Sequence, residues 1–232
     1  MVTTGLVAYF PLNNTTQESV SGLSVTTATT VTYATTGGKT GLVCTSAVYS
    51  ASSTNIITNV NIPNLNLVGT GVGYSFSFWL YQNNVTNAQS NAFTFMNASL
   101  SGFAAQAYNN TLYFSYNFNG GTTTNCNGPL TNLAWNHVVF VVNSNQTTTL
   151  YINNVIPSNN PPTPVGNNTT VYPSSMSIGS GNKFGIGCDN SFSYNLSGWT
   201  GAGKVYNGYF SKLGIYNIPL SAAQVTALYN AG

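Results

Sequence analysis

Two apolar segments in the C-terminal half of the chain constrain its fold most. The first, Trp135–Val142 (WNHVVFVV), leads to a second apolar run and then to the polar pair Asn153–Asn154. The other, Gly208–Tyr216 (GYFSKLGIY), leads to the sequence LSAAQVTALY at 220–229. Short runs rich in β-branched and aromatic residues are typical of strands buried in a sheet. These segments therefore predict a layered fold built from strands.

The same strand pattern recurs along the whole chain, between clusters of Gly, Asn, Pro and Ser. The clear strands are Leu6–Phe10, Ser75–Tyr81, Ala92–Met96, Leu112–Phe118, His137–Asn143, Thr148–Ile152, Met176–Ile178 and Tyr209–Tyr216, and the weaker ones are Gly41–Thr45, Asn55–Thr58 and Gly102–Ala107. With 232 residues, 42% of them hydrophobic, the chain can bury a large core. We predict an all-β, two-sheet antiparallel sandwich that spans residues 1–232 as a single domain. Asn153–Pro173 and Ser180–Tyr206 are predicted to be long surface loops.

Turn and helix signals complete the predicted architecture. Asn109–Asn110 and Asn153–Asn154 suit two-residue hairpin turns, because Asn tolerates a positive φ. Ser221 and Gln224 have the spacing of a capping box, which satisfies free N–H groups at the start of a helix. We therefore expect a short C-terminal helix over Leu220–Tyr229.

In this order, the segments resemble the laminin G-like domains of the concanavalin A-like lectin/glucanase superfamily. Residues 5–14 (GLVAYFPLNN) resemble the family's opening G-L-V-A-Y-Y-P-F-D-G, and residues 74–80 (YSFSFWL) resemble its F-T-I-S-A-W-V strand. Residues 135–138 resemble its W-x-H-V strand, 177–179 its L-R-I-G segment, and 208–225 its last strand and L-S-x-x-E-I helix. The resemblance implies a concanavalin A-like jelly roll and a family that consists mostly of binding modules, often for carbohydrate.

Acidic residues are scarce where the family commonly has them. The chain contains four lysines, no arginine, and only Glu18 and Asp189 as acids. Asn13–Asn14 and Ser211–Lys212 stand at positions where calcium-binding members use Asp and Glu. Because Ca²⁺ is held by six to eight oxygens that usually include carboxylates, we predict no cofactor and no metal site. A weak calcium site of carbonyls, Asn amides and Asp189 is the alternative.

The same scarcity argues against catalysis. Glycoside hydrolysis normally needs two carboxyl groups that flank the bond, and the two acids form no cluster. Residues 209–217 also resemble a strand of jelly-roll alginate lyases, but without arginine a substrate carboxylate has no bidentate partner. A polysaccharide lyase is therefore the least favoured alternative. For His137, the only histidine, the resemblance to the family's W-x-H-V motif implies a structural role in which the ring caps the strand edge, rather than the role of general base. Trp79 and Trp135 are predicted to lie in the core.

A loop with an embedded tryptophan, SGWTGAG at 197–203, is the predicted ligand-binding segment. An aromatic ring exposed there could stack on a sugar while Asn and Thr donate hydrogen bonds. The alternative is that these rings fold back and plug the sandwich, and Lys183 and Lys204 bracket the loop. The candidate ligand-binding residues are Trp199, Tyr194, Tyr206 and Asp189.

Charge and hydropathy limit the partners. A net charge of +2 is too small and dispersed for nucleic acid, and no apolar run is long enough for membrane insertion. The start MVTTGLVAYFP lacks a secretory leader, so the fold is expected to begin at the initiator Met; a virion protein or a trimmed secreted one would fit. Three cysteines, Cys44, Cys126 and Cys188, allow either one bridge and a free thiol or three free thiols.

The sequence thus predicts a non-catalytic, lectin-like binding or adhesion module on a virion or extracellular surface, with glycans as partners. The alternative is a structural capsid or appendage protein that packs against neighbouring subunits, as a homo-oligomer for example.

Overall fold

The computed structural model describes residues 2–15, 17–20, 26–27, 31–44, 57–58, 73–83, 90–96, 102–117, 124–144, 147–158, 167–168, 183–186 and 206–232. Fifteen strands and one helix lie in these ranges. The strands are β1 (Leu6–Phe10), β2 (Thr26–Thr27), β3 (Tyr33–Thr36), β4 (Lys39–Cys44), β5 (Ile57–Thr58), β6 (Tyr74–Gln82), β7 (Ser90–Met96), β8 (Gly102–Tyr108), β9 (Thr111–Asn117), β10 (Thr124–Pro129), β11 (Trp135–Val142), β12 (Thr148–Ile152), β13 (Asn167–Asn168), β14 (Lys183–Ile186) and β15 (Gly208–Tyr216), and the helix is α1 (Ala222–Asn230).

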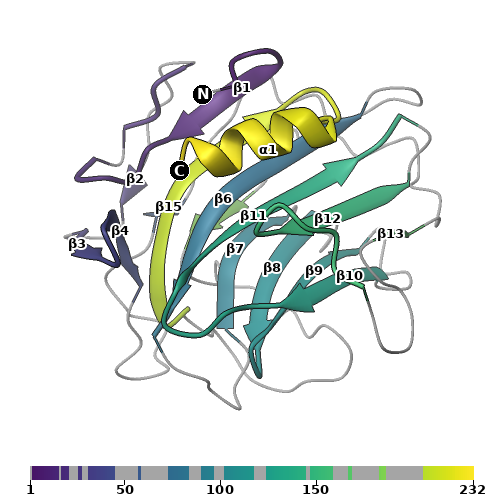
Figure 1. Ribbon diagram of the computed structural model, residues 1–232. Coiled ribbons are helices and arrows are strands. Elements are labelled where there is room, and N and C mark those ends of the chain that lie inside the picture. Colours follow the sequence, from purple (N-terminus) through teal and green to yellow (C-terminus); the bar gives the residue numbers. More distant parts are fainter. Residues whose placement is uncertain are drawn as a thin grey trace.

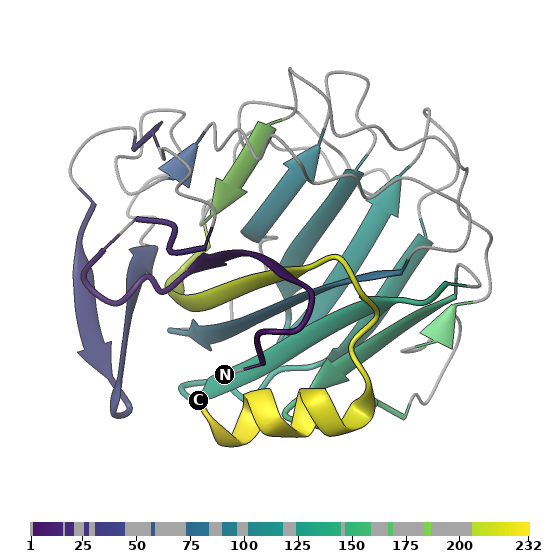
Figure 2. The ribbon, with the colours of Figure 1, turned by 90° about the horizontal axis from the view of Figure 1, so that it is seen from above.

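The strands form two antiparallel sheets that pack face to face (Figures 1 and 2). One sheet has eight strands in the order β13-β12-β11-β6-β15-β4-β3, with β1 also paired to β15. The other has seven strands in the order β10-β9-β8-β7-β14-β5-β2. Helix α1 lies on the outer face of the eight-stranded sheet, and the two chain ends lie side by side (Figure 2). The predicted two-sheet sandwich with a short C-terminal helix is confirmed.

Most predicted elements are present within a residue or two of their expected limits, but some strands were missed. The strands β3 and β10 carry mostly small or polar residues, so they lack the apolar alternation that identifies a strand. Asn153–Pro173 and Ser180–Tyr206 are not continuous loops, because β13 and β14 lie inside them. The predicted strand Met176–Ile178 falls outside the described residues.

The turn and cap predictions are confirmed. Asn109 and Asn110 have φ values of 47° and 56°, and Asn153 and Asn154 have 52° and 65°, as left-handed hairpin turns require. At α1, the Ser221 side chain accepts the Gln224 N–H, and the Gln224 side chain in turn accepts the Ser221 N–H.

Aromatic side chains fill the space between the sheets. Phe114 of the seven-stranded sheet stacks on Phe140 of the eight-stranded sheet, with ring centroids 3.9 Å apart. Phe78 stacks on Phe210 at 5.1 Å. Cys44 and Cys126 are buried free thiols in the same core. Cys188 lies outside the described residues. Because these rings come from both sheets, the core itself holds the layers together.

A second, smaller core lies between α1 and the outer face of the eight-stranded sheet. Leu220 and Val225 pack there against Val139 and Val141 of β11. The Ser75 hydroxyl fixes the segment that leads into α1, because it donates to the Ile218 carbonyl and accepts the Leu220 N–H, both at 2.9 Å. In the described part of the chain, no helix has both the length and the hydropathy that crossing a membrane requires.

The strand β15 changes partner halfway along its length. Its first residues pair with β4 and its last residues with β1, and the register shifts between Ser211 and Gly214. Lys212 takes a left-handed φ of 55° in this bulge. The Ser211 hydroxyl joins the two partner strands, since it donates to the Thr40 carbonyl at 2.9 Å and lies 3.4 Å from the Pro11 carbonyl. Ser211, at one of the positions where the resemblance implies an acid, is thus a structural residue of the sheet.

We predict that Ser75→Ala lowers the free energy of unfolding by about 1–3 kcal/mol, because it leaves the partly buried Ile218 carbonyl and the buried Leu220 N–H without their partner. Urea denaturation followed by tryptophan fluorescence measures this loss. The exposed Ser158→Ala is the matched control and should change stability by less than about 0.5 kcal/mol. Equal stability of the two variants would show that Ser75 does not anchor α1.

Candidate functional site

Three rings form a row across the outer face of the eight-stranded sheet, at one end of the sheet. Tyr81 of β6 lies directly opposite Trp135 of β11 on one side and Tyr209 of β15 on the other. The Tyr81 ring meets the other two edge-on, at centroid distances of 5.7 Å and 5.5 Å. All three side chains are half-buried. We call Tyr81, Trp135 and Tyr209 the aromatic row.

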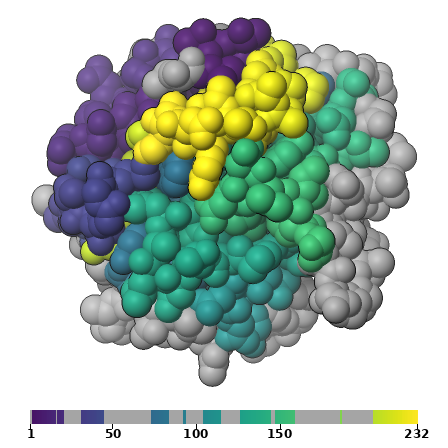
Figure 3. Space-filling view, in the orientation of Figure 1, coloured from purple at the N-terminus to yellow at the C-terminus, as the bar shows by residue number. Residues whose placement is uncertain are grey.

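The hairpin of β3 and β4 packs against the aromatic row and fixes it. The Trp135 indole N–H donates to the Thr36 carbonyl at 2.7 Å. A Cβ at Gly41 would lie 2.7 Å from the Trp135 ring, so only glycine fits there without a shift. Figure 3 shows this face, with α1 in yellow and the hairpin in dark blue both standing on it beside the teal segment that carries β11. The rings are therefore held rigidly, which limits the entropy that a ligand would lose by ordering them.

Trp79 lies one row further along β6 and is covered on several sides. Its ring stacks on Tyr229 of α1 at 5.9 Å and contacts His137 at 4.9 Å. The Lys39 ammonium lies over the ring, 4.1 Å from its centroid, and 5.9 Å from that of Trp135. Trp79 is buried, as predicted, but against α1 rather than between the sheets. Trp135, which was also assigned to the core, is half-buried on the outer face.

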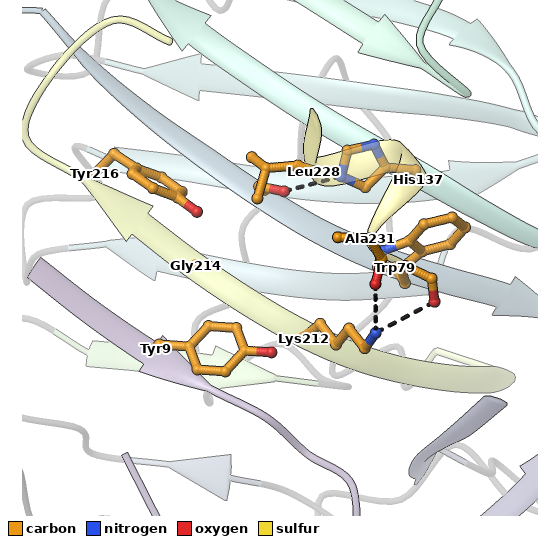
Figure 4. Close-up of a pocket in the computed structure, with 10 residues that line it drawn as sticks. Tyr9, Trp79, His137, Lys212, Gly214, Tyr216, Leu228 and Ala231 are labelled. Carbon is orange, nitrogen blue, oxygen red and sulfur yellow. Dashed lines mark hydrogen bonds between the residues drawn. The ribbon is translucent and has the colours of Figure 1, made fainter. Parts of the chain in front are cut away.

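Beyond Trp79, a pocket of about 120 Å³ opens beneath the C-terminal end of α1 (Figure 4). Its floor is low because Ser77 and Gly214, two small residues, pair across β6 and β15. The rings of Tyr9 and Tyr216 stand on one side and Trp79 on the other. Sites for whole small molecules are about 300–1,000 Å³, so this pocket suits a few waters or one small group rather than a sugar ring.

His137 is a structural residue of this pocket wall. Its Nε2 lies 3.0 Å from the Ser77 hydroxyl, and its Nδ1 is buried without a hydrogen-bond partner among the described residues. Burial, with smaller contributions from Lys39 and Lys212, lowers its pKa to about 3. The ring lies over β11, an interior strand, rather than at the strand edge where it was expected. An imidazole with so low a pKa accepts a proton weakly, and its burial keeps it from a substrate, so His137 is poorly suited to act as a general base near pH 7.

Lys212 lines the pocket and contacts the C-terminal end of α1. Its ammonium donates to the carbonyls of Ala231 at 3.5 Å and Gly232 at 3.2 Å. Carbonyls at the C-terminal end of a helix lack intrahelical partners and favour a cation. Lys212 therefore serves the end of α1, whereas Lys39 makes no such contact with the described residues.

The structure places one of the four predicted ligand-binding residues. Tyr206 is fully buried in the core between the sheets, and burial raises the pKa of its phenol well above 10. Its ring therefore offers no face to a ligand, and it follows the alternative in which such rings plug the sandwich. Trp199, Tyr194 and Asp189 lie outside the described residues and remain predictions. Lys204 lies outside them too.

Glu18, the acid among the described residues, is bound by backbone N–H groups. One oxygen of Glu18, which is 2% exposed, accepts the N–H groups of Tyr9 and Val20, both at 2.7 Å. Within the described ranges, no three His, Cys, Asp or Glu residues gather as a metal site would require. Asn13 and Asn14 are exposed in the first turn. Glu18 thus stabilises the turn after β1.

Protonation of His137 should set much of the acid sensitivity of this fold. Its pKa is about 3 in the folded state against 6.5 unfolded, so between these values the unfolded state binds more protons. The stability contributed by the neutral ring is complete above pH 6.5 and is lost as the pH falls towards 3, by up to about 1.4 kcal/mol per pH unit. Urea denaturation from pH 3 to 8 measures the slope. His137→Gln should flatten it, and an unchanged slope would contradict this assignment.

Comparison with known proteins agrees with this architecture. Residues 54–226 match the protein family described as "Concanavalin A-like lectin/glucanases superfamily". No curated protein matches the chain. Among solved structures, the binding domain of botulinum neurotoxin serotype D is 14% identical with a TM-score of 0.70, and 98% of this chain covers 52% of that one. The type G receptor-binding domain is 10% identical with a TM-score of 0.65, over 98% of this chain and 51% of that one.

A serotype D ligand-binding domain in complex with N-acetylneuraminic acid is also similar, with 12% identity and a TM-score of 0.65 over 98% of this chain and 51% of that one. This chain therefore spans about half the length of these structures, and at such identities they share its fold. The two-sheet sandwich, the capped C-terminal helix and the match over residues 54–226 show that the chain belongs to the concanavalin A-like lectin/glucanase superfamily.

Proposed function

We propose that this chain is a non-catalytic, lectin-like binding or adhesion module that contacts glycans. The observation that carries the proposal is the aromatic row, three half-buried rings held in register on an outer sheet face. Aromatic rings combine an apolar face with low conformational entropy, which suits contact with the C–H faces of a sugar ring. The pocket beside the row could receive one small substituent of such a ligand.

The described polar groups support binding rather than catalysis. A glycosidase normally needs two carboxyl groups that flank the bond, and this chain has two acids. Glu18 is one of them, and its carboxylate is bound to backbone N–H groups, so it does not supply half of such a pair. His137 is buried and its pKa is about 3. We assign the row a purely recognitive role, in keeping with the structural neighbours whose names describe receptor-binding domains and, in one case, a complex with N-acetylneuraminic acid.

We further propose that the module acts on a virion or another extracellular surface. A chain with 3% charged residues must present mainly neutral polar groups to solvent. Such a surface favours contacts through hydrogen bonds and apolar faces over salt-dependent ionic attraction. The three ligand-binding residues outside the described ranges, Trp199, Tyr194 and Asp189, form a second proposed contact region.

A glycan array probed with the full chain tests this function, followed by calorimetry with the best ligand. Tyr209→Ala should weaken binding roughly three- to tenfold, because an aromatic contact contributes about 0.5–1.5 kcal/mol beyond its buried area. The control is Tyr113→Ala, which removes a half-buried tyrosine from β9 of the other sheet and should leave affinity unchanged. Trp199→Ala tests the second region. Absence of any glycan signal above background, for the chain alone and in its native assembly, would contradict the proposal.

A structural capsid or appendage subunit is the second candidate function, and exposed apolar side chains favour it. Leu133 and Val155 are 61% and 62% exposed. Ala223 and Ala227 are exposed on α1, which carries no charged side chain. A neutral surface of this kind can be buried against a neighbour without desolvating ions.

If the chain is such a subunit, Val155→Asp should shift the assembled form towards monomer, because the new carboxylate would have to be desolvated in the contact. Sedimentation velocity at high protein concentration measures the shift. Ser158→Asp, at a nearby exposed position, is the control. A wild-type chain that stays monomeric and is missing from purified particles would rule this candidate out.

A further inference from the structure

Lys39 is a cation without a counter-ion among the described residues. The chain has two acids, Glu18 is buried on backbone N–H groups, and no described carboxylate contacts the Lys39 ammonium. Its described neighbours are the rings of Trp79 and Trp135, at 4.1 Å and 5.9 Å from their centroids. A cation–π contact orients an ammonium but does not neutralise its charge.

The surroundings of Lys39 make its charge costly in the free protein. Burial, and then repulsion by Lys212, lowers its pKa to about 8. The Lys212 ammonium donates to the carbonyls that end the chain's helical segment, so that lysine is already engaged. His137 stays neutral and offers no compensation. The described part of this face therefore holds two neighbouring ammonium groups and no acidic side chain.

An anion that reached this face would relieve the cost. It would supply the counter-charge that no described acidic side chain gives Lys39, and it would meet an ammonium whose position the Trp79 ring already restricts. The position matters because Lys39 also lies within reach of Trp135, a member of the aromatic row. A ligand stacked on the row brings its substituents next to the lysine.

We infer that Lys39 is a specificity-determining residue which binds a carboxylate, so that the aromatic row selects an acidic glycan over a neutral one. This inference rests on the proposed glycan-binding function and names the substrate class of that site. The contact required is one charge-assisted hydrogen bond from the Lys39 ammonium to a carboxylate oxygen. No covalent or redox step is involved.

The test uses acidic oligosaccharides, uronic-acid and sialic-acid types, and the same oligosaccharides with their carboxyl groups methyl-esterified. Esterification removes the charge and keeps most of the shape. We expect the intact chain to prefer the acid form, and Lys39→Gln to lower affinity for it roughly tenfold, with affinity for the ester unchanged. Lys39→Arg should keep the preference, because the guanidinium is also a cation.

Two further experiments test whether the preference for the acidic oligosaccharide comes from Lys39 or from another lysine. Lys183→Gln and Lys204→Gln remove the lysines that bracket the predicted loop site and should leave the preference intact. Raising the pH through about 8 should weaken binding of the acid by the intact chain, since Lys39 loses its proton there, and should not weaken binding by Lys39→Arg.

The outcomes distinguish this inference from the proposed function. Equal affinity for acid and ester, or a preference that survives in Lys39→Gln, overturns the role of Lys39 and leaves a glycan-binding module in place. Loss of the preference in Lys183→Gln or Lys204→Gln alone assigns it to the loop and also overturns the inference. If neither the acids nor their esters bind, the proposed function itself fails.

Discussion

The incomplete cover of the eight-stranded sheet by α1 decides where a ligand can reach this fold. Leu220 and Val225 bury one end of the sheet's outer face under the helix. The Trp79–Tyr229 stack marks the limit of that cover. Beyond this limit the aromatic row faces outwards, and the strand face that is core under the helix becomes a surface.

Because charged side chains are so few, neutral polar side chains make the buried hydrogen bonds of this fold. Asn153, in the hairpin after β12, is an example. Its Oδ1 accepts the His137 N–H, as an aspartate could, but its Nδ2 also donates to Asn136. The buried Asn136 in turn bonds both polar groups of Thr131's backbone. The amide side chains of Asn136 and Asn153 are thus paired without an ion, so the turn needs no counter-charge. Against this neutral background, a lysine beside the aromatic row with no acidic partner among the described residues supports the proposed anionic ligand.

Strand positions could be predicted from the sequence, but the neighbours across the sheet could not. Periodicity located β6, β11 and β15, because their apolar runs are long and bounded by turn residues. The aromatic row depends instead on register and strand order, which place Tyr81 between Trp135 and Tyr209. No local pattern encodes pairing between residues this far apart in the chain. The alternation of Trp79 with Tyr81 on β6 was the available signal, and it fits an inner face equally well.

The assignments of single aromatic residues failed for a related reason. Tyr206 was grouped with Trp199 because both are embedded in a glycine-rich stretch. Yet Tyr206 lies two residues before β15 and is drawn into the core with that strand. Conversely, Trp135 sits in an apolar strand but at its first residue, beyond the reach of α1, so it remains half-buried. In both cases position along the strand outweighs local composition.

The two proposed functions make competing demands on one region of the surface. Leu133 is exposed two residues before Trp135, and its N–H donates to the Gln82 carbonyl beside Tyr81. A neighbouring subunit that buried Leu133 would therefore approach the aromatic row and restrict a glycan's access to it. Val155, by contrast, lies next to the turn at Asn154, which accepts a hydrogen bond from Thr226 of α1. Contacts through Val155 and α1 would leave the row open. The module can thus be both a subunit and a lectin if its neighbours contact α1 and Val155 rather than Leu133 and the aromatic row.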